Sequence, residues 1–458
     1  MNFPLFIFLL FALQVFYWII GCRSSFNVKG QTEYFLAGKS VKFFPLMMTF
    51  LATQVGGGII LGAAEEAYRF GWPVLLYPLG AVSGLILLGC GLGSKLAGLQ
   101  VSTVAQIFEI IYGSVPLRKV ASLLSVISLF MILVAQIIAS HKFLVSMGMD
   151  HAAVFVLFWA FVIVYTAQGG LKAVIATDVV QAAFFSAVFL LCFGYVLLFE
   201  PSISISEASR IGDLAEVSSK LWGWLLMPLL FMLIEQDMGQ RCFAGASSHV
   251  VSKAAFWAGI CTLVICIVPV FLGSLARIMG VEVPTGGSVL MAVVARTTNP
   301  WITALVGCAI LAAIISTATS LINAISSNLS SDFSFSLLKS IDPMKIARGG
   351  SCLISLGAIF FAFYFDNIVD ILIQSYELSV SCLFVPVVMA LFIRKGHAEA
   401  AFTAIGLGAV GFFLLPSDPI PKEIAGLCLS FAGYGVGTLI HHTRTLFKQQ
   451  LKGSQGVS

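Results

Sequence analysis

Apolar runs of about 20 residues recur along almost the whole chain, separated by short segments that carry charges, glycine or proline. A helix of that length spans the hydrocarbon core of a bilayer. Of the 458 residues 59% are hydrophobic and only 10% are charged, and the mean hydropathy is +1.01. A soluble domain has about 25% charged residues. The sequence therefore predicts an all-α, multi-pass membrane protein, and it excludes a soluble enzyme, a nucleic-acid-binding protein and a disordered chain.

The apolar runs predict about thirteen membrane spans. They fall at 3–21, 43–67, 72–94, 120–140, 151–168, 173–198, 221–240, 254–279, 299–330, 349–365, 368–393, 400–416 and 424–440. No basic residue precedes the first run, whereas Arg23 and Lys29 follow it. This charge order predicts that the first helix is retained and that the N-terminus lies outside.

The basic residues agree with this orientation. It places 18 of the 25 Lys and Arg residues in internal segments, as the positive-inside rule requires. The other seven are Arg69, Lys142, Arg210, Lys220, Arg277, Arg296 and Lys422. An external loop at 199–220 carries the acidic residues Glu200, Glu207, Asp213 and Glu216. We expect a plasma (inner) membrane protein with a cytoplasmic C-terminus.

Cysteine and histidine residues give no sign of a metal or redox centre. The ten cysteines are scattered through apolar runs without a CxxC pair, and the six histidines form no HExxH motif. Isolated cysteines in apolar helices are usually inert packing residues. The sequence therefore predicts no transition-metal site.

Charged residues inside the spans are functional candidates, because a charge at bilayer depth is costly. They are Glu65, Glu66, Asp178, Glu235, Asp237 and Glu377. A paired or interfacial structural role is an equally good interpretation of Glu65, Glu66 and Asp237. Asp178 follows Lys172 closely enough to lie at an interface as well.

Three consecutive glycines interrupt the second span, within Ala52–Gly62. Glycine removes side-chain support, and broken backbone at membrane depth occurs only where it is buried in protein or lines a polar cavity. The carbonyl groups freed by a break are good ligands for a hard cation. Close helix packing through small residues is the alternative interpretation.

Hydroxyl groups gather in the ninth span. Ser316, Thr319 and Ser320 share one helical face, and Ala313 lies one turn before Ser316 and Thr317. Two hydroxyls and an unobstructed carbonyl suit a monovalent cation such as Na⁺. A hydroxyl-rich packing face is the alternative.

Five motifs in order carry a family resemblance. They are Thr32–Lys39, Ala52–Tyr68, Gly169–Val174 continuing to Thr177–Gln181, Gln240-Arg241 with Ala246–Ser248, and Ala312–Ser320 ending near Asp332. On these motifs the chain resembles the sodium:solute symporter family over roughly residues 30–440. The resemblance implies a leucine-transporter-type fold, in which two inverted five-helix repeats surround a central site. It also implies sodium-coupled secondary active symport of a small organic solute by alternating access, and no enzymatic activity.

The resemblance divides the chain into four parts. Residues 1–42 would form an extra N-terminal helix and a cytoplasmic loop, and 43–198 the first repeat with core helices 1–5. Residues 199–395 would form the second repeat with core helices 6–10. Residues 396–458 would add two trailing helices and a cytoplasmic tail.

The family's main sodium site maps onto five positions here. The carbonyl groups of Ala52, Val55 and Ala313 and the hydroxyl groups of Ser316 and Thr317 would hold the ion. A second sodium site found in some relatives maps onto Asp178, Ser316, Thr319 and Ser320.

The same resemblance places the solute among the first, second, third, sixth and tenth core helices. The candidates are Gln54, Gly56, Ile59, Tyr77, Gln136, Glu235, Gln236, Gln374, Tyr376 and Glu377. Gly56 and Ile59 offer few polar partners, which argues against a sugar or sialic acid. The second span resembles the choline branch most, yet that branch has an aromatic residue at the position of Gln54, and quaternary amines prefer aromatic faces. The buried acids favour an amino acid such as proline, or a small amine.

Alternative functions stay open at this point. They are a proton-coupled carrier of the same fold, a symporter of choline, another organic cation or an organic anion, a channel, and a membrane enzyme. Ala313, Ser316 and Thr317 cannot act as a proton relay, and no nucleophile or metal constellation supports an enzyme. We expect Na⁺ as the coupling ion, no other cofactor, and a small solute and the lipid bilayer as partners, without nucleic acid or an obligatory protein partner.

Overall fold

The computed structural model describes residues 3–25, 30–99, 101–149, 151–199, 217–218, 220–333, 343–393, 396–415 and 421–455. Within these ranges the chain is helical, without a named strand, and Val41 and Gly245 form one isolated bridge. The four acidic residues of the predicted 199–220 loop lie outside the described residues, as do Lys29, Arg210, Lys339, Arg394 and Lys395.

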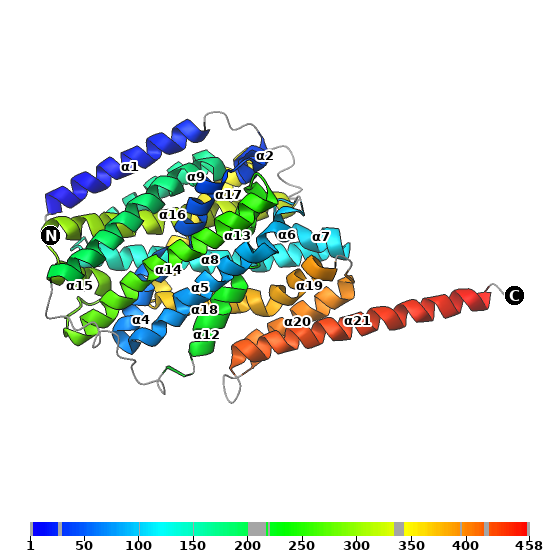
Figure 1. The fold of residues 1–458 in the computed structure, drawn as a ribbon. Helices are drawn as coiled ribbons and strands as arrows, with labels where there is room; N and C mark the ends of the chain where they lie inside the picture. Colours follow the sequence, from blue (N-terminus) through cyan, green and yellow to red (C-terminus); the bar gives the residue numbers. More distant parts are fainter. Residues whose placement is uncertain are drawn as a thin grey trace.

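The first half of the chain forms the helices drawn from blue to cyan and green in Figure 1. They are α1 (Phe3–Ser25), α2 (Gln31–Leu36), η1 (Ala37–Lys39), α3 (Phe43–Gln54), η2 (Gly58–Gly62), α4 (Ala63–Phe70), η3 (Trp72–Leu75), α5 (Leu76–Leu87), η4 (Leu88–Leu92), α6 (Gly93–Ala97), α7 (Gln106–Tyr112), α8 (Val115–Ser146) and α9 (Ala152–Phe199).

The second half continues the bundle and ends in a helix that extends beyond it (Figure 1). Its helices are α12 (Leu221–Phe231), α13 (Gln236–Ala244), α14 (Ser248–Ile278), α15 (Val289–Thr297), α16 (Pro300–Asp332), α17 (Pro343–Phe361), η6 (Ala362–Tyr364), α18 (Ile368–Ser379), η7 (Val380–Phe384), α19 (Val385–Ile393), α20 (Ala398–Leu414) and α21 (Lys422–Gln455).

The prediction of an all-α, multi-pass protein is confirmed. Among the described residues eight helices are long and apolar enough to cross a membrane, or nine if a bent pair counts as one span. Three shorter apolar helices add to them, namely Ala153–Val164, Arg348–Tyr364 and Ala398–Leu414. The number of thirteen spans stays a prediction.

Helix α16 forms the centre of the bundle. In its most apolar stretch 94% of the residues are buried, and it contacts α1, α3, α8, α9 and α17. Small residues such as Ala312, Ala313 and Ala318, all buried, let neighbouring backbones approach closely. A helix surrounded by protein in this way can carry polar groups away from lipid.

The predicted break in the second span is present. Helices α3 and α4 are bent by 52°, with the break at Val55–Gly57. A Cβ atom at Gly56 would lie 2.5 Å from the Thr317 hydroxyl, and one at Gly57 would lie 2.4 Å from Ala139. The glycines therefore allow contact with α16 and α8 that any side chain would prevent.

A second break separates α12 from α13. Helix α12 ends at Phe231, and Glu235 has extended backbone angles (φ −64°, ψ 132°) directly before α13. Sequence analysis treats 221–240 as one span and misses this break. The two acids at Glu235 and Asp237 are the signal for it, because polar groups at membrane depth accompany broken backbone.

Within α9 the direction of the chain changes at Gly170. Its angles (φ 60°, ψ −170°) are open to glycine alone, and a Cβ atom there would lie 2.6 Å from Tyr34. The Gly169-Gly170 motif thus separates the fifth predicted span from the sixth and seats the α2 segment against the turn.

Candidate cation and solute site

Oxygen atoms from α3 and α16 converge at the first break. The Ser316 hydroxyl lies 2.9 Å from the Ala52 carbonyl and 2.8 Å from the Ala313 carbonyl. The Thr317 hydroxyl lies 3.3 Å and 3.2 Å from the same two carbonyls and 3.1 Å from that of Thr53. All five residues are buried. The structure therefore brings together four of the five residues expected around sodium.

Val55, the fifth expected ligand, is buried and begins the non-helical segment (φ −84°, ψ 73°). Backbone outside a helix leaves carbonyl groups without their intrahelical partners. Hydroxyl groups can rotate to turn lone pairs toward a cation. The set fits Na⁺ by its chemistry, since hard monovalent ions prefer neutral and anionic oxygen atoms.

An arginine lies among the residues of the second expected sodium site. The buried Arg241 guanidinium is 3.4 Å from the Asp178 carboxylate and 2.6 Å from the Ser320 hydroxyl. It also donates to Thr49 (3.0 Å), whose hydroxyl in turn donates to Asp178 (2.5 Å). Thr319, another expected ligand, is bound to the Ser316 carbonyl at 3.0 Å. A fixed positive charge thus occupies the neighbourhood of Asp178.

A cavity of about 30 Å³ lies beside the cation set and shares Thr317 with it. Seven of the ten expected solute-binding residues line this cavity, namely Gln54, Gly56, Ile59, Tyr77, Gln136, Glu235 and Tyr376. Gln136 accepts a hydrogen bond from the Gly57 amide at 2.7 Å, which fixes α8 to the break. The ring of Tyr376 stacks on Phe231 with centroids 4.7 Å apart.

Three expected residues lie elsewhere. Gln236 accepts from the Val104 amide at 2.7 Å and is not among the residues that line the central cavity. Gln374 and Glu377 line a separate cavity, where Glu377 forms an ion pair with Lys422 at 2.8 Å. Sequence spacing alone could not separate these residues from the central set.

Asp237 lines the central cavity, although sequence analysis does not place it among the solute-binding candidates. In an unbroken helix residues two apart point about 200° away from each other. Because Glu235 is extended and α13 begins only after it, both acids reach the same cavity. Thr53, Gly58, Ile132, Leu321 and Leu372 complete its lining.

Ion pairs join several helices at the end of the bundle predicted to be external. Glu65 on α4 accepts from Lys142 of α8 at 2.8 Å. Glu66 lies 3.6 Å from Lys220, at the start of α12, and accepts from Asn367, at the start of α18, at 3.1 Å. Glu65 and Glu66 thus have the structural, paired role that the sequence left open.

The opposite end carries a second cluster of charges. Arg118 on α8 pairs with Glu109 at 2.6 Å and with Asp332, the last residue of α16, at 2.8 Å. Ser122 and Thr103 also donate to Asp332, at 2.8 Å and 2.9 Å. The cavity thus lies between two charged clusters.

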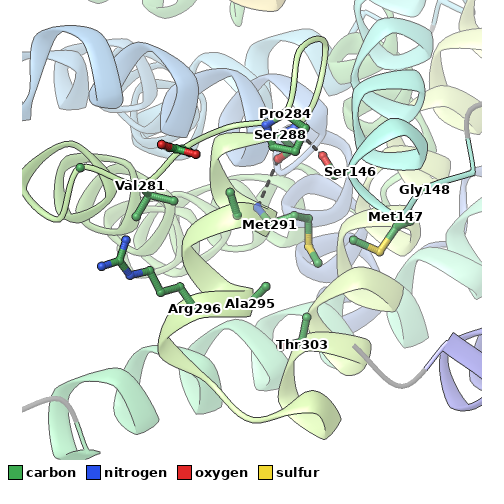
Figure 2. Close-up of a pocket in the computed structure, with 13 residues that line it drawn as sticks. Ser146, Met147, Gly148, Val281, Pro284, Ser288, Met291, Ala295, Arg296 and Thr303 are labelled. Carbon is green, nitrogen blue, oxygen red and sulfur yellow. Dashed lines mark hydrogen bonds between the residues drawn. The ribbon is translucent and has the colours of Figure 1, made fainter.

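A larger pocket of about 870 Å³ lies at the end of the bundle predicted to be external, between α15 and the last residues of α8 (Figure 2). The Ser288 amide donates to Ser146, and the Met291 amide lies 3.4 Å from the Ser288 hydroxyl. Arg296 and Thr303 also line the pocket. It shares no lining residue with the central cavity.

Solved structures share this architecture. A sodium-coupled sialic acid symporter, described as substrate-bound and outward-open with a novel sodium site, superposes with a TM-score of 0.76. It is 18% identical, and the match covers 94% of this chain and 96% of that one. The nucleobase-cation-symport transporter Mhp1 gives a TM-score of 0.62 at 13% identity, covering 88% and 93%. Both are leucine-transporter-type folds, which confirms the expected fold class.

Curated relatives are similar over shorter stretches. High-affinity choline transporter 1 of Caenorhabditis elegans is 28% identical over 54% of this chain and 43% of its own length. The sodium/pantothenate symporter of Haemophilus influenzae is 26% identical over 48% and 45%. The chain thus spans less than half the length of these two relatives.

The family comparison covers most of the chain. The profile of the sodium:solute symporter family matches residues 34–408, which include both helix breaks, the cation set and the central cavity. The chain belongs to the sodium:solute symporter family.

Proposed function

We propose that this chain imports a small organic solute together with one Na⁺ by alternating access. The observation that carries the proposal is the convergence of the Ala52 and Ala313 carbonyls with the Ser316 and Thr317 hydroxyls at a helix break. Val55 would complete the set. As part of this proposal, residues 43–198 and 199–395 form the two inverted repeats. Residues 1–42 and 396–458 lie outside the repeats.

The shared position of Thr317 supports coupling between ion and solute. Thr317 belongs to the cation set and also lines the central cavity, where a Cβ atom on Gly56 would collide with it. An ion held between α3 and α16 would stabilise the shape of the cavity, and a bound solute would stabilise the ion site. Such reciprocal coupling is typically worth about 1–3 kcal/mol.

One ion per cycle follows from the place of Arg241. Its guanidinium lies between Asp178 and Ser320, so the second set of Asp178, Ser316, Thr319 and Ser320 already holds a positive charge. At a membrane potential of about 100 mV one Na⁺ contributes about 2.3 kcal/mol. That corresponds to roughly 50-fold accumulation of the solute.

The favoured solute is an amino acid such as proline, or a small amine. The acids Glu235 and Asp237 line the cavity and are buried, and Gly56 and Ile59 add no polar group. Choline, another organic cation or an organic anion is the alternative solute, and a proton gradient is the alternative driving force. We place the protein in the plasma (inner) membrane, with the N-terminus outside and the C-terminus in the cytoplasm.

The double substitution Ser316→Ala with Thr317→Ala tests the ion site. It removes two of five oxygen ligands, so we expect loss of stabilisation by Na⁺ in a thermal-shift assay and loss of sodium-driven uptake. The matched control is Thr303→Ala with Ser330→Ala, which removes the same two hydroxyl types elsewhere on α16. Unchanged sodium dependence in the first variant would refute the site, and uptake driven by a pH gradient without Na⁺ would favour the proton-coupled carrier.

A further inference from the structure

Four of the seven acidic residues buried among the described residues have a basic partner. Asp178 pairs with Arg241, Asp332 with Arg118, Glu377 with Lys422, and Glu66 with Arg69 and Lys220. Glu235 and Asp237 form no ion pair among the described residues, although both are buried beside the central cavity. Removing a charge from water without a partner costs several kcal/mol. Their position in the cavity therefore calls for an explanation other than stability.

Of the two acids, Asp237 is the clearer case of a buried carboxylate without a partner. Its side chain is 0% solvent-accessible, and neither carboxylate oxygen has a hydrogen-bond partner among the described groups. Arg241, one turn later, donates to the Asp237 backbone carbonyl at 2.9 Å and directs its other donors to Thr49, Asp178 and Ser320. The start of α13 favours a negative charge there, yet it leaves both acceptor atoms free.

A count of formal charges gives the sign of the missing partner. Asp178, Glu235 and Asp237 surround the site, and Arg241 is their one buried basic neighbour among the described residues. If Glu235 and Asp237 are both ionised when the solute is bound, one Na⁺ in the cation set leaves a single negative charge uncompensated. A solute group with one positive charge balances it, whereas an anionic solute would add a further charge.

We propose that the solute is recognised through an ammonium group with N–H bonds, held between the carboxylates of Asp237 and Glu235. This inference rests on the proposed function and names its solute class. An N–H donor satisfies a buried carboxylate oxygen, and a quaternary ammonium has none to give. Tyr77 and Tyr376 line the same cavity. The site therefore selects primary and secondary amines, amino acids included, over choline-like compounds.

Graded N-methylation tests this selectivity on the unmodified protein. Two series serve as probes, glycine to its N,N,N-trimethyl derivative and ethanolamine to choline, each in Na⁺ and in K⁺ buffer at equal ionic strength. We expect sodium-dependent thermal stabilisation by compounds with N–H bonds and an affinity lower by about tenfold for the trimethyl members. Equal or tighter binding of the trimethyl members, or stabilisation by sugars and organic anions alone, would overturn the proposal. So would the absence of any shift by both series.

Substitutions of the two carboxylates test where the ammonium group binds. Asp237→Asn and Glu235→Gln keep the shape and remove the charge, and we expect each to weaken the amine response by about tenfold or more. Asp370→Asn is the matched control, since that acid lies half-exposed at the external end. Stabilisation by Na⁺ alone shows that each variant is folded. An unchanged amine response in both folded variants contradicts the proposal.

The experiments can refute the sodium site and the ammonium site independently of each other. If Na⁺ stabilises neither the unmodified protein nor any variant, the sodium site is wrong, and amine selectivity in K⁺ buffer still reports on Asp237. If Na⁺ stabilises but the amines do not, the sodium site stands and the ammonium assignment falls.

Discussion

At the scale of single residues, Arg241 has the most demanding surroundings in the bundle. It is fully buried and contacts Thr49, Asp178, Ser320 and the Asp237 backbone. Breaking a buried ion pair by removing one partner leaves an uncompensated charge, which costs more than the pair itself contributes. The stability of the core should therefore depend on this one side chain.

Arg241→Gln tests that dependence. We expect a loss of about 3–5 kcal/mol in unfolding free energy, because the Asp178 carboxylate stays buried without its partner. Asp178→Asn combined with Arg241→Gln should recover part of the loss. High Na⁺ should stabilise Arg241→Gln more than the unmodified protein, since the vacated position retains oxygen ligands. Denaturant titration measures both effects, and a loss no larger than that of Asp370→Asn would contradict the assignment.

At the scale of helices, the two breaks create the site. The first frees backbone carbonyls beside α16, and the second turns Glu235 and Asp237 toward one cavity. Helix α8 packs directly against Gly57, and its residue Gln136 accepts a hydrogen bond from the Gly57 amide. Because Gly57 has no side chain, α8 can approach the break this closely. Packing and site geometry are thus coupled at this residue.

Gly57→Ala is the corresponding prediction. The added methyl group would lie 2.4 Å from the Ala139 Cβ atom, and overpacking of this kind typically costs about 1–3 kcal/mol. We expect lower thermal stability and weaker stabilisation by Na⁺, since α8 must move away from the break. Gly435→Ala on α21 serves as control, with open space around the new methyl group. Equal behaviour of the two variants would show that the break tolerates a side chain.

At the scale of the whole molecule, charged clusters hold the helices together at each end of the central cavity. Glu65–Lys142 and Glu66–Lys220 connect α4, α8 and the start of α12, and Arg118–Asp332 connects α8 to α16. Alternating access requires that one end opens while the other stays closed. In the proposed transport cycle, the two clusters therefore favour opposite conformations.

Opposite effects on sodium affinity are the expected consequence. We propose that Na⁺ favours the outward-facing state, so Lys142→Gln should raise the apparent affinity for Na⁺ by loosening the external end. Arg118→Gln should lower it by loosening the internal end. Weakening a partly exposed pair by about 1 kcal/mol corresponds to a change of about fivefold. Sodium titration by thermal shift measures both, and a shift of the same sign in the two variants would contradict the proposal.

The family and its fold could be predicted from sequence because the signals are local. Apolar runs predict the spans, and the motifs around Ala52–Tyr68 and Ala312–Ser320 predict membership in a family of transporters rather than enzymes, which the family match confirms. The residues of the main cation set follow from the same motifs, and their convergence in the structure agrees with that prediction.

What sequence alone determined is therefore the membrane class and the family, and it also predicts the uncharged oxygen ligands, since these depend on composition and short-range spacing. Tertiary structure decided which acids face the cavity and which have partners. Glu377 and Gln236 are engaged elsewhere, Arg241 fills the space beside Asp178, and Asp237 reaches the centre. The physical reason is that a helix break resets the direction of the side chains after it, and an ion pair depends on residues far apart in the chain.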